Sequence, residues 1–224
     1  MPQPIDHPEE FGLPEDLVAI GGELDTETLL DAYKSGVFPW PEDDDLPMLW
    51  FFPNPRGILR HDNLHISRSL RRTLNKNIFE IQIDTVFDQV IEHCRTAPRP
   101  GQAGTWITSA MKQAYKRLHR EGFAHSVEAF HEGKLVGGVY GVYVNNTFSG
   151  ESMFHTMPDA SKAALVALVR TLHRAGVHWI DTQMTTPVVE ALGGELISKN
   201  EYLDMLENNR KHSVISWSAV KNSL

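Results

Sequence analysis

The sequence predicts an α+β fold with a mixed, mostly antiparallel sheet and flanking helices. Three strand-like runs follow one another, separated only by the tight-turn dipeptides Glu132-Gly133 and Asn145-Asn146, which indicates an antiparallel meander. The runs cover 126–130, 135–144 and 147–154. A helical stretch over 161–175 then leads to a strand over 179–183, and this order predicts a strand–helix–strand crossover.

The first 62 residues are expected to form a small N-terminal domain, residues 1–62. Residues 1–22 are rich in proline and glycine and are expected to be irregular. Asp25 is a suitable N-cap for a helix over 26–34, which Gly36 would end. Prolines between residues 37 and 57 argue against a regular interior element, while the aromatic residues among them indicate an ordered loop region.

Residues 63–224 are expected to form the larger domain. Before the meander, the sequence predicts helices over 67–74 and 86–93, a strand over 79–83, and a helix that Ser109 caps and Gly122 ends. After the crossover it predicts a helical turn and a short last strand. These two elements cover 188–192 and 196–197.

Charge is distributed unevenly along the chain. The 29 acidic and 21 basic residues give a net charge of −8, which argues against a general coat on nucleic acid. Residues 1–50 hold 13 acids and one base, whereas residues 51–120 hold 12 bases and five acids. The basic stretch therefore allows local contact with RNA. The acidic run Asp43–Asp45 would repel RNA, attract a basic N-terminus or form a solvated loop.

Simple features exclude several classes of protein. Cys94 is the only cysteine, which excludes an intrachain disulfide and a cysteine zinc site. The 11 histidines form no convincing ligand set, so no metal is expected. No apolar run approaches the ~18–20 residues of a membrane span, and the N-terminus lacks a signal-peptide pattern. We expect a cytoplasmic protein that does not contact a membrane.

Three polar residues are candidates for chemistry. Asp181 and Gln183 lie two apart on a predicted strand and should share a face, where they form either a structural hydrogen-bonded pair or part of a site. Glu151 stands among apolar neighbours, and its burial requires a partner. It is either a paired structural carboxylate or a functional one.

Two further sets of residues would suit RNA. Aromatic side chains beside polar or loop residues can stack on bases, although each would also suit a core. These are Tyr33, Trp40, Trp106 and Tyr115. Basic residues near the helix over 67–74 would contact phosphates or form a solvated helix face. These are Arg68, Arg71, Arg72 and Lys76.

Several short sequence motifs occur together along the chain. They include Gly36-Val37-Phe38-Pro39-Trp40, Pro53-Asn54-Pro55-Arg56, His125-Ser126-Val127-Glu128, Gly150-Glu151-Ser152-Met153-Phe154 and Asp181-Thr182-Gln183. With them the chain resembles the leucyl/phenylalanyl-tRNA–protein transferase family over roughly residues 11–207. The resemblance implies an aminoacyltransferase with a GNAT-like large domain. Its substrates would be leucyl-tRNA and phenylalanyl-tRNA, with Met possible, and proteins with an N-terminal Lys or Arg. The transferred residue would mark them for N-end rule degradation.

The resemblance also implies roles for individual residues. Trp40 and Trp106 would stack on the terminal adenosine, with Tyr33 and Tyr115 nearby. Further residues would contact the rest of the donor from the predicted strands. They would form an apolar pocket for the Leu or Phe side chain, contact the aminoacyl end and lie at the reacting ester. The residues concerned are Val139 and Phe148 for the pocket, Gly150 and Glu151 for the aminoacyl end, and Asp181 and Gln183 for the ester. The basic residues would hold the acceptor stem of the tRNA.

The expected chemistry needs no cofactor, because the aminoacyl ester is already activated. Amides have negligible basicity, so Gln183 would act by hydrogen bonding, and Asp181 would orient it and stabilise charge on the attacking amine. Residues 155–161 lack the glycine and arginine of a pyrophosphate loop, so an acyl-CoA N-acyltransferase is disfavoured. Transfer of Leu to N-terminal Asp or Glu and a non-catalytic tRNA- or peptide-binding relative remain alternatives. Val139 and Val188 depart from the family pattern and affect substrate preference, and a monomer is expected.

Overall fold

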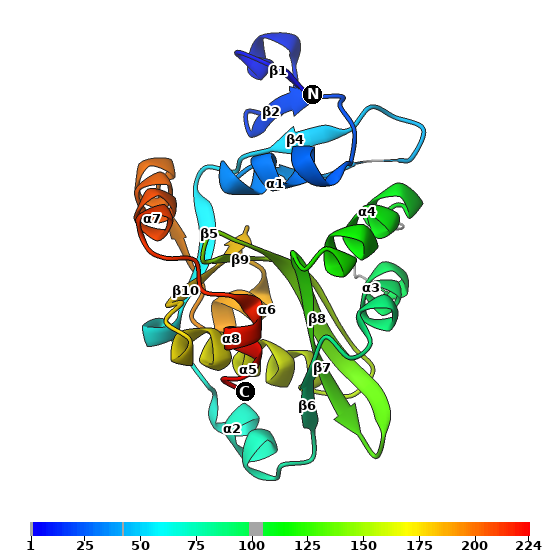
Figure 1. Cartoon of the computed structure of the whole chain (residues 1–224), viewed down its shortest axis with the longest axis vertical. Helices are drawn as coiled ribbons and strands as arrows, with labels where there is room; N and C mark the ends of the chain where they lie inside the picture. Colours follow the sequence, from blue (N-terminus) through cyan, green and yellow to red (C-terminus); the bar gives the residue numbers. More distant parts are fainter. Residues whose placement is uncertain (1, 42, 99–104) are drawn as a thin grey trace.

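The computed structural model describes residues 2–41, 43–98 and 105–224. It contains a four-stranded sheet near the N-terminus and a seven-stranded sheet flanked by helices (Figure 1). The α+β class and the mixed, mostly antiparallel sheet are confirmed. No described helix has the length and apolar character needed to cross a membrane.

The small sheet has the strand order β1-β2-β4-β3. Its strands are β1 (Gln3–Pro4), β2 (Leu17–Ile20), β3 (Phe38–Pro39) and β4 (Leu49–Phe51), with the 3-10 helix η1 (Pro8–Phe11) and the helix α1 (Thr26–Lys34) between them. The expectation of irregular backbone over 1–22 and 37–57 is therefore wrong. Pro39 is accommodated because β3 is an edge strand, where a missing N–H costs little. The Asp25 cap is confirmed, since its carboxylate accepts from Thr28 N at 2.9 Å.

The large sheet has the strand order β11-β5-β10-β9-β8-β7-β6. Its strands are β5 (Arg56–Arg60), β6 (Glu80–Ile83), β7 (Ala124–His131), β8 (Lys134–Val144), β9 (Thr147–His155), β10 (Trp179–Gln183) and β11 (Glu195–Ile197). Only β9 and β10 pair in parallel, joined by the helix of the predicted crossover. The meander over β7, β8 and β9 is also as predicted.

Helices pack on both faces of the large sheet (Figure 1). They are α2 (Arg68–Asn75), α3 (Phe87–Thr96), α4 (Ser109–Arg120), α5 (Ala160–Arg174), α6 (Pro187–Ala191), α7 (Lys199–Lys211) and α8 (Trp217–Lys221), with the 3-10 helix η2 (His61–Asn63) after β5. Val139 packs with α5 on one face, and its neighbour Tyr140 packs with α3 and α4 on the other. The cap of α4 is Thr108, one residue before the predicted Ser109.

The division at residue 62 stays a prediction. Strand β5 lies before this boundary, yet it pairs with β10 and β11 inside the large sheet. The N-terminal segment is therefore joined to the rest of the chain by backbone hydrogen bonds as well as by side-chain packing.

Candidate active site

A cavity of about 290 Å³ opens between the small sheet and the adjacent ends of β9 and β10. It brings together most of the residues predicted to form a site. These are Trp40, Trp106, Val139, Gly150, Glu151 and Gln183. The remaining lining is largely apolar, and it includes Met153, Leu165, Ile180 and Val189. Such a cavity suits an apolar group held next to a few polar atoms.

Two tryptophans lie at one side of the cavity. The ring centroids of Trp40 and Trp106 are 6.0 Å apart, with 43° between the ring planes. Trp40 follows β3, and its backbone N–H donates to Leu49 O at 2.8 Å. Its ring also meets Phe51 edge-on at 6.5 Å. The pair therefore forms a fixed aromatic surface facing the cavity.

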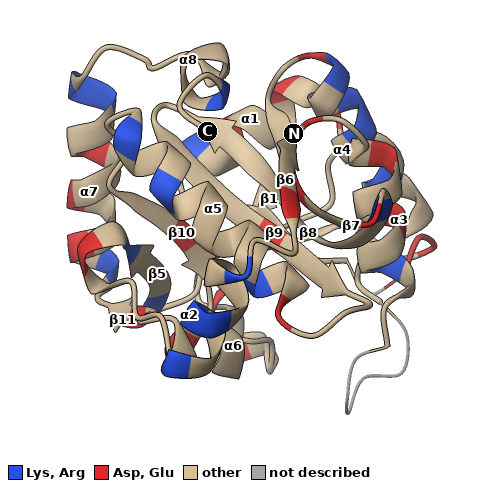
Figure 2. Cartoon of the chain, turned by 90° about the horizontal axis from the view of Figure 1, so that it is seen from below, with Lys and Arg blue, Asp and Glu red and all other residues tan. Residues whose placement is uncertain are grey.

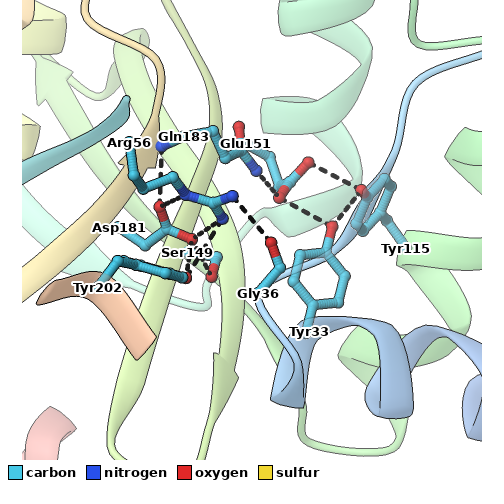
Figure 3. A network of polar contacts seen from close by, with 9 residues as sticks. All are labelled: Tyr33, Gly36, Arg56, Tyr115, Ser149, Glu151, Asp181, Gln183 and Tyr202. Atoms are coloured by element: carbon cyan, nitrogen blue, oxygen red, sulfur yellow. Dashed lines mark hydrogen bonds and ion pairs between the residues drawn. The ribbon is translucent and has the colours of Figure 1, made fainter. Parts of the chain in front are cut away.

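The carboxylate of Glu151 lies among three donors (Figure 3). Tyr33 Oη donates to Oε1 at 2.8 Å and Tyr115 Oη donates to Oε2 at 2.8 Å. Gln183 Nε2 donates to Oε1 at 2.8 Å. Burial, and then the charge of Glu151, raise the pKa of both phenols well above the ordinary value, so they stay protonated. Glu151 is thus held in one orientation beside the cavity.

The same burial affects the acidity of Glu151. It raises the pKa of this carboxyl to about 7, although the hydrogen bonds from Tyr115, Tyr33 and Gln183 lower it. Glu151 therefore exchanges a proton near neutral pH, which is the range in which a carboxylate can act as a general base.

Tyr33 and Tyr115 have a different place from the one expected. Both rings are buried, neither lines the cavity, and their hydroxyls lie 2.6 Å apart beside Glu151. They are therefore unsuited to stacking on a base and instead position the carboxylate.

Asp181 forms a buried ion pair with Arg56 (Figure 3). Arg56 Nε and Nη2 donate to the two carboxylate oxygens at 2.8 and 2.6 Å, and each side chain is only 1% exposed. Tyr202 Oη and Ser149 Oγ donate to the same carboxylate at 2.9 and 3.1 Å. Asp181 Oδ1 also accepts from the backbone N–H of Gln183 at 2.9 Å. These donors surround the carboxylate of Asp181, and Asp181 is not among the residues that line the cavity.

Gln183 departs from the regular strand that was expected. The pairing of β10 with β5 shifts register between Asp181 and Gln183, and Gln183 has a φ of 60°. As a result the side chains of Asp181 and Gln183 have separate partners, Arg56 and Glu151. A bulge that turns a side chain toward a site is a common feature next to functional centres.

Arg56 and Tyr202 are not among the residues predicted to form the site. Arg56 is the only charged residue between Trp50 and Leu59, a signal that a partnered charge is buried there. Its Nη1 donates to the carbonyl of Gly36 at 2.8 Å. Gly36 has a φ of 77°, and a Cβ at this position would lie 2.6 Å from Tyr202. Glycine is therefore required where α1 ends against this ion pair.

Two family models match successive parts of this chain. The model of the family described as leucyl/phenylalanyl-tRNA protein transferase matches residues 58–207, and the model of its N-terminal domain matches residues 22–54. The chain belongs to the leucyl/phenylalanyl-tRNA protein transferase family. It is therefore an aminoacyltransferase.

Curated family members are similar along most of their length. A leucyl/phenylalanyl-tRNA–protein transferase from Nitratidesulfovibrio vulgaris strain DP4 is 48% identical over 195 residues, which cover 87% of this chain and 83% of the relative. The Myxococcus xanthus protein of the same name is 46% identical over 211 residues, 92% of this chain and 90% of the relative. Among solved structures, a GCN5-related N-acetyltransferase-like protein from Streptococcus suis aligns with a TM-score of 0.38 and 13% identity, covering 77% of this chain and 64% of that one.

Two pocket residues expected from the family are placed differently. Val139 lines the cavity, whereas Phe148 is fully buried and absent from the lining. The ring of Phe148 faces Trp217 of α8, with 5.8 Å between centroids. Val188 of α6 is also absent from the lining, while its neighbour Val189 is part of it. Val139 and Val189 are thus part of the apolar lining in this family member, whereas Phe148 and Val188 are not.

Two groups of basic residues in the family member differ in their partners. Those of α2 and its C-cap, Arg68, Arg71, Arg72 and Lys76, are exposed and form no ion pair within the described residues (Figure 2). By contrast, Lys112 and Lys116 of α4 pair with Glu92 and Asp88 of α3. Of these two groups, the α2 group offers positive charge to an anionic partner, whereas the charges of Lys112 and Lys116 are compensated.

Asp84, His119 and His125 form the one group of described residues whose atoms are close enough to share a metal ion, within 4.8 Å. Hydrogen bonds already engage these atoms. The two nitrogens of His125 lie 3.0 Å from Asp84 Oδ2 and 3.0 Å from Gly122 O. His119 Nδ1 faces a backbone carbonyl at 2.8 Å, and Trp217 Nε1 donates to Asp84 at 2.7 Å. The group is better suited to joining α8 to the sheet than to binding a metal.

Proposed function

We propose that this enzyme transfers Leu or Phe, and possibly Met, from aminoacyl-tRNA to the α-amine of proteins with an N-terminal Lys or Arg. The reaction would take place in the cytoplasm and would mark the acceptor for N-end rule degradation. The observation that supports this most is the oriented carboxylate of Glu151, which lies beside an apolar cavity next to a tryptophan pair.

The donor is expected to enter as its 3′-terminal aminoacyl-adenosine. The Trp40–Trp106 pair offers the base a stacking surface, which typically contributes about 1–3 kcal/mol per base. The apolar lining around Val139 and Val189 favours Leu or Phe, because removing their apolar side chains from water is favourable there. Gly150, at the cavity wall, leaves space beside Glu151 for the aminoacyl ester.

The chemistry follows from the groups at the cavity. The α-amine attacks the ester carbonyl carbon, a C–N bond forms, and the C–O bond to the ribose breaks. The amine loses a proton to Glu151, and Glu151 returns this proton to the ribose oxygen, which leaves as the hydroxyl. An α-amine has a pKa of about 7.7–8.0, so a base with a pKa near 7 is adequate. Gln183 donates to Glu151 through Nε2 and can accept a hydrogen bond from the amine through Oε1.

Asp181 has a positioning role in this proposal. Its charge is already balanced by Arg56, and its Oδ1 holds the backbone N–H of Gln183. It therefore fixes the bulge that directs Gln183 toward Glu151 and acts on the amine only through that residue.

A transfer assay tests the proposed function. The enzyme is incubated with leucyl-tRNA or phenylalanyl-tRNA and peptides that begin with Arg, Lys, Asp or Glu, with an acyl-CoA as a control donor. We expect products only from the aminoacyl-tRNAs and only on the Arg and Lys peptides. Product on Asp or Glu peptides, product from acyl-CoA, or no product at all would each contradict the proposal.

The α2 residues are expected to hold the tRNA backbone. Replacing both Arg68 and Arg71 by Gln should weaken tRNA binding and reduce the slope of log K against log salt by about 2, roughly 1 for each lost phosphate contact. The KM for the acceptor peptide should not change. Lys112→Gln is a suitable control, because Lys112 is paired with Glu92. An equal salt slope in the double variant and the wild type would refute this role for α2.

A further inference from the structure

We propose that Asp44 is a positioning residue that sets the separation of Trp40 and Trp106 by fastening the β3–β4 loop to the first turn of α4. The inference rests on the proposed function to the extent that the tryptophan pair receives the donor. It assigns a specific role to one of the three acids of the Asp43–Asp45 run.

The contact joins segments that are far apart in sequence. Ser109 N donates to Asp44 Oδ2 at 2.9 Å, and Ala110 N donates to Asp44 Oδ1 at 3.0 Å. Both oxygens of one carboxylate are thus engaged by two consecutive amides. Hydrogen bonds from Thr108 and then Ala110 lower the pKa of Asp44, so it stays ionised at neutral pH.

The first turn of α4 is incomplete without this carboxylate. The N–H of Met111 is satisfied by Thr108 Oγ1 at 3.3 Å, and the N–H of Lys112 makes the first regular helical bond, to Thr108 O at 3.0 Å. The N–H groups of Ser109 and Ala110 remain, and these are the two that Asp44 binds. The first turn of α4 contains no acidic residue of its own. Asp44 therefore also supplies the negative charge that a helix N-terminus favours.

Both tryptophans lie close in sequence to the two sides of this contact. Trp40 lies four residues before Asp44, and its backbone hydrogen bond to Leu49 O fixes it to β4. On the other side, Thr108 N donates to Trp106 O at 3.0 Å, and Ile107 between them is fully buried. The ring contact between the tryptophans and the contact of Asp44 with α4 thus join the same two segments of the chain at two points. Loss of the Asp44 contact should therefore loosen the contact between the rings.

The neighbouring acids provide matched controls. Asp43 and Asp45 carry the same charge and are exposed, but no described backbone amide of α4 donates to them. The side chain of Asp43 accepts a local hydrogen bond from Asp45 N at 3.3 Å. Asp43→Ala and Asp45→Ala therefore remove the same charge from the same loop and leave the contact in place.

The test compares Asp44→Ala, Asp44→Asn, Asp43→Ala and Asp45→Ala. Asp44→Ala should raise the KM for aminoacyl-tRNA by about three- to tenfold, with the kcat and the acceptor KM within twofold of wild type. The KM of Asp44→Asn for aminoacyl-tRNA should lie between those of the wild type and Asp44→Ala, because the Asn side chain has one acceptor oxygen instead of two. In the free enzyme, the near-ultraviolet circular dichroism signal of the tryptophan pair should weaken in Asp44→Ala, weaken less in Asp44→Asn, and stay unchanged in Asp43→Ala and Asp45→Ala. The melting temperature verifies that each variant is folded.

Two results would overturn the proposal. One is an Asp44→Ala enzyme with unchanged donor KM and unchanged tryptophan signal. The other is an equal effect of all three alanine variants, which would assign the effect to the charge of the run. If the wild type transfers no amino acid, the proposed function fails, while the circular dichroism comparison still decides whether Asp44 holds the pair.

Discussion

Replacing Glu151 by Gln is expected to lower the transfer rate by about 100-fold or more, the usual contribution of a positioned general base. A Gln side chain keeps one acceptor oxygen for Tyr33 and can donate its Nε2–H to Tyr115 Oη, but it cannot take the proton of the attacking amine. The measurement is single-turnover transfer with saturating leucyl-tRNA and an Arg peptide. A variant that keeps more than a third of the wild-type rate would exclude Glu151 as the proton acceptor.

The pH dependence provides a second readout. With a pKa of about 7, Glu151 is protonated and inactive as a base below that pH, so the wild-type rate should rise as pH increases through 7. The acceptor amine adds a second rise near its own pKa of about 7.7–8.0. In Glu151→Gln the rise near 7 should disappear and the rise due to the amine should remain. A wild-type profile with only the amine rise would contradict the assignment.

As pH rises toward 7, the free energy of unfolding should fall while the transfer rate increases. The folded pKa of Glu151 lies above its ordinary value of 4.5, so the native state holds the proton more tightly than the unfolded chain. Between about pH 4.5 and 7 the wild type therefore loses stability as pH rises, and Glu151→Gln is spared this loss. Glu128→Gln is the matched control. Burial likewise raises the pKa of Glu128 to about 7, but Glu128 does not line the cavity, so its replacement should spare transfer.

Replacing Arg56 by Met is expected to destabilise the fold by about 3–5 kcal/mol, because it leaves the buried carboxylate of Asp181 without its cation. Urea denaturation at pH 7 measures this loss. Arg60→Met, on the same strand, is the control. Arg60 pairs with Glu195 and Glu201 while about a third exposed, so its loss should cost less than about 1 kcal/mol.

The double variant Arg56→Met/Asp181→Asn sharpens this test. Removing the charge of Asp181 as well should recover part of the stability, because the remaining groups are then neutral. Equal losses for Arg56→Met and Arg60→Met, or strict additivity in the double variant, would mean that the buried pair does not stabilise the fold as described.

The parts of the fold that local sequence determines were predictable. The β7–β9 meander is marked by turn dipeptides, and α5 has a clear helical apolar pattern that ends at a glycine. The small sheet was not predictable, because β3 is two residues long and exists only through pairing with β4. Helix α7 was missed because only Tyr202 and Leu206 of its residues are buried. The Ser198–Glu201 spacing, typical of a capping box, would have indicated where it starts.

The candidate site shows the same division. Glu151 and Gln183 could be singled out because polar residues stood in apolar surroundings. The partners of Glu151 and of Asp181 could not be inferred, since Tyr33 lies 118 residues from Glu151 and Arg56 lies 125 residues from Asp181. The bulge at Gln183 is likewise a product of tertiary pairing, and it separates two side chains that regular strand alternation would have placed on one face.

The pairing of β5 with β10 and β11 has a consequence for synthesis of the chain on the ribosome. Strand β5 is made early, yet the strands on either side of it begin at Trp179 and Glu195. Arg56 must therefore wait for Asp181, and for Tyr202 beyond it, before its charge can be enclosed. Contacts of such long range form late in folding. The carboxylate of Glu151, whose donors come from Tyr33, Tyr115 and Gln183, is completed at the same stage. A ribosome-bound fragment that ends before β10 should thus be able to build the meander while still lacking a working centre.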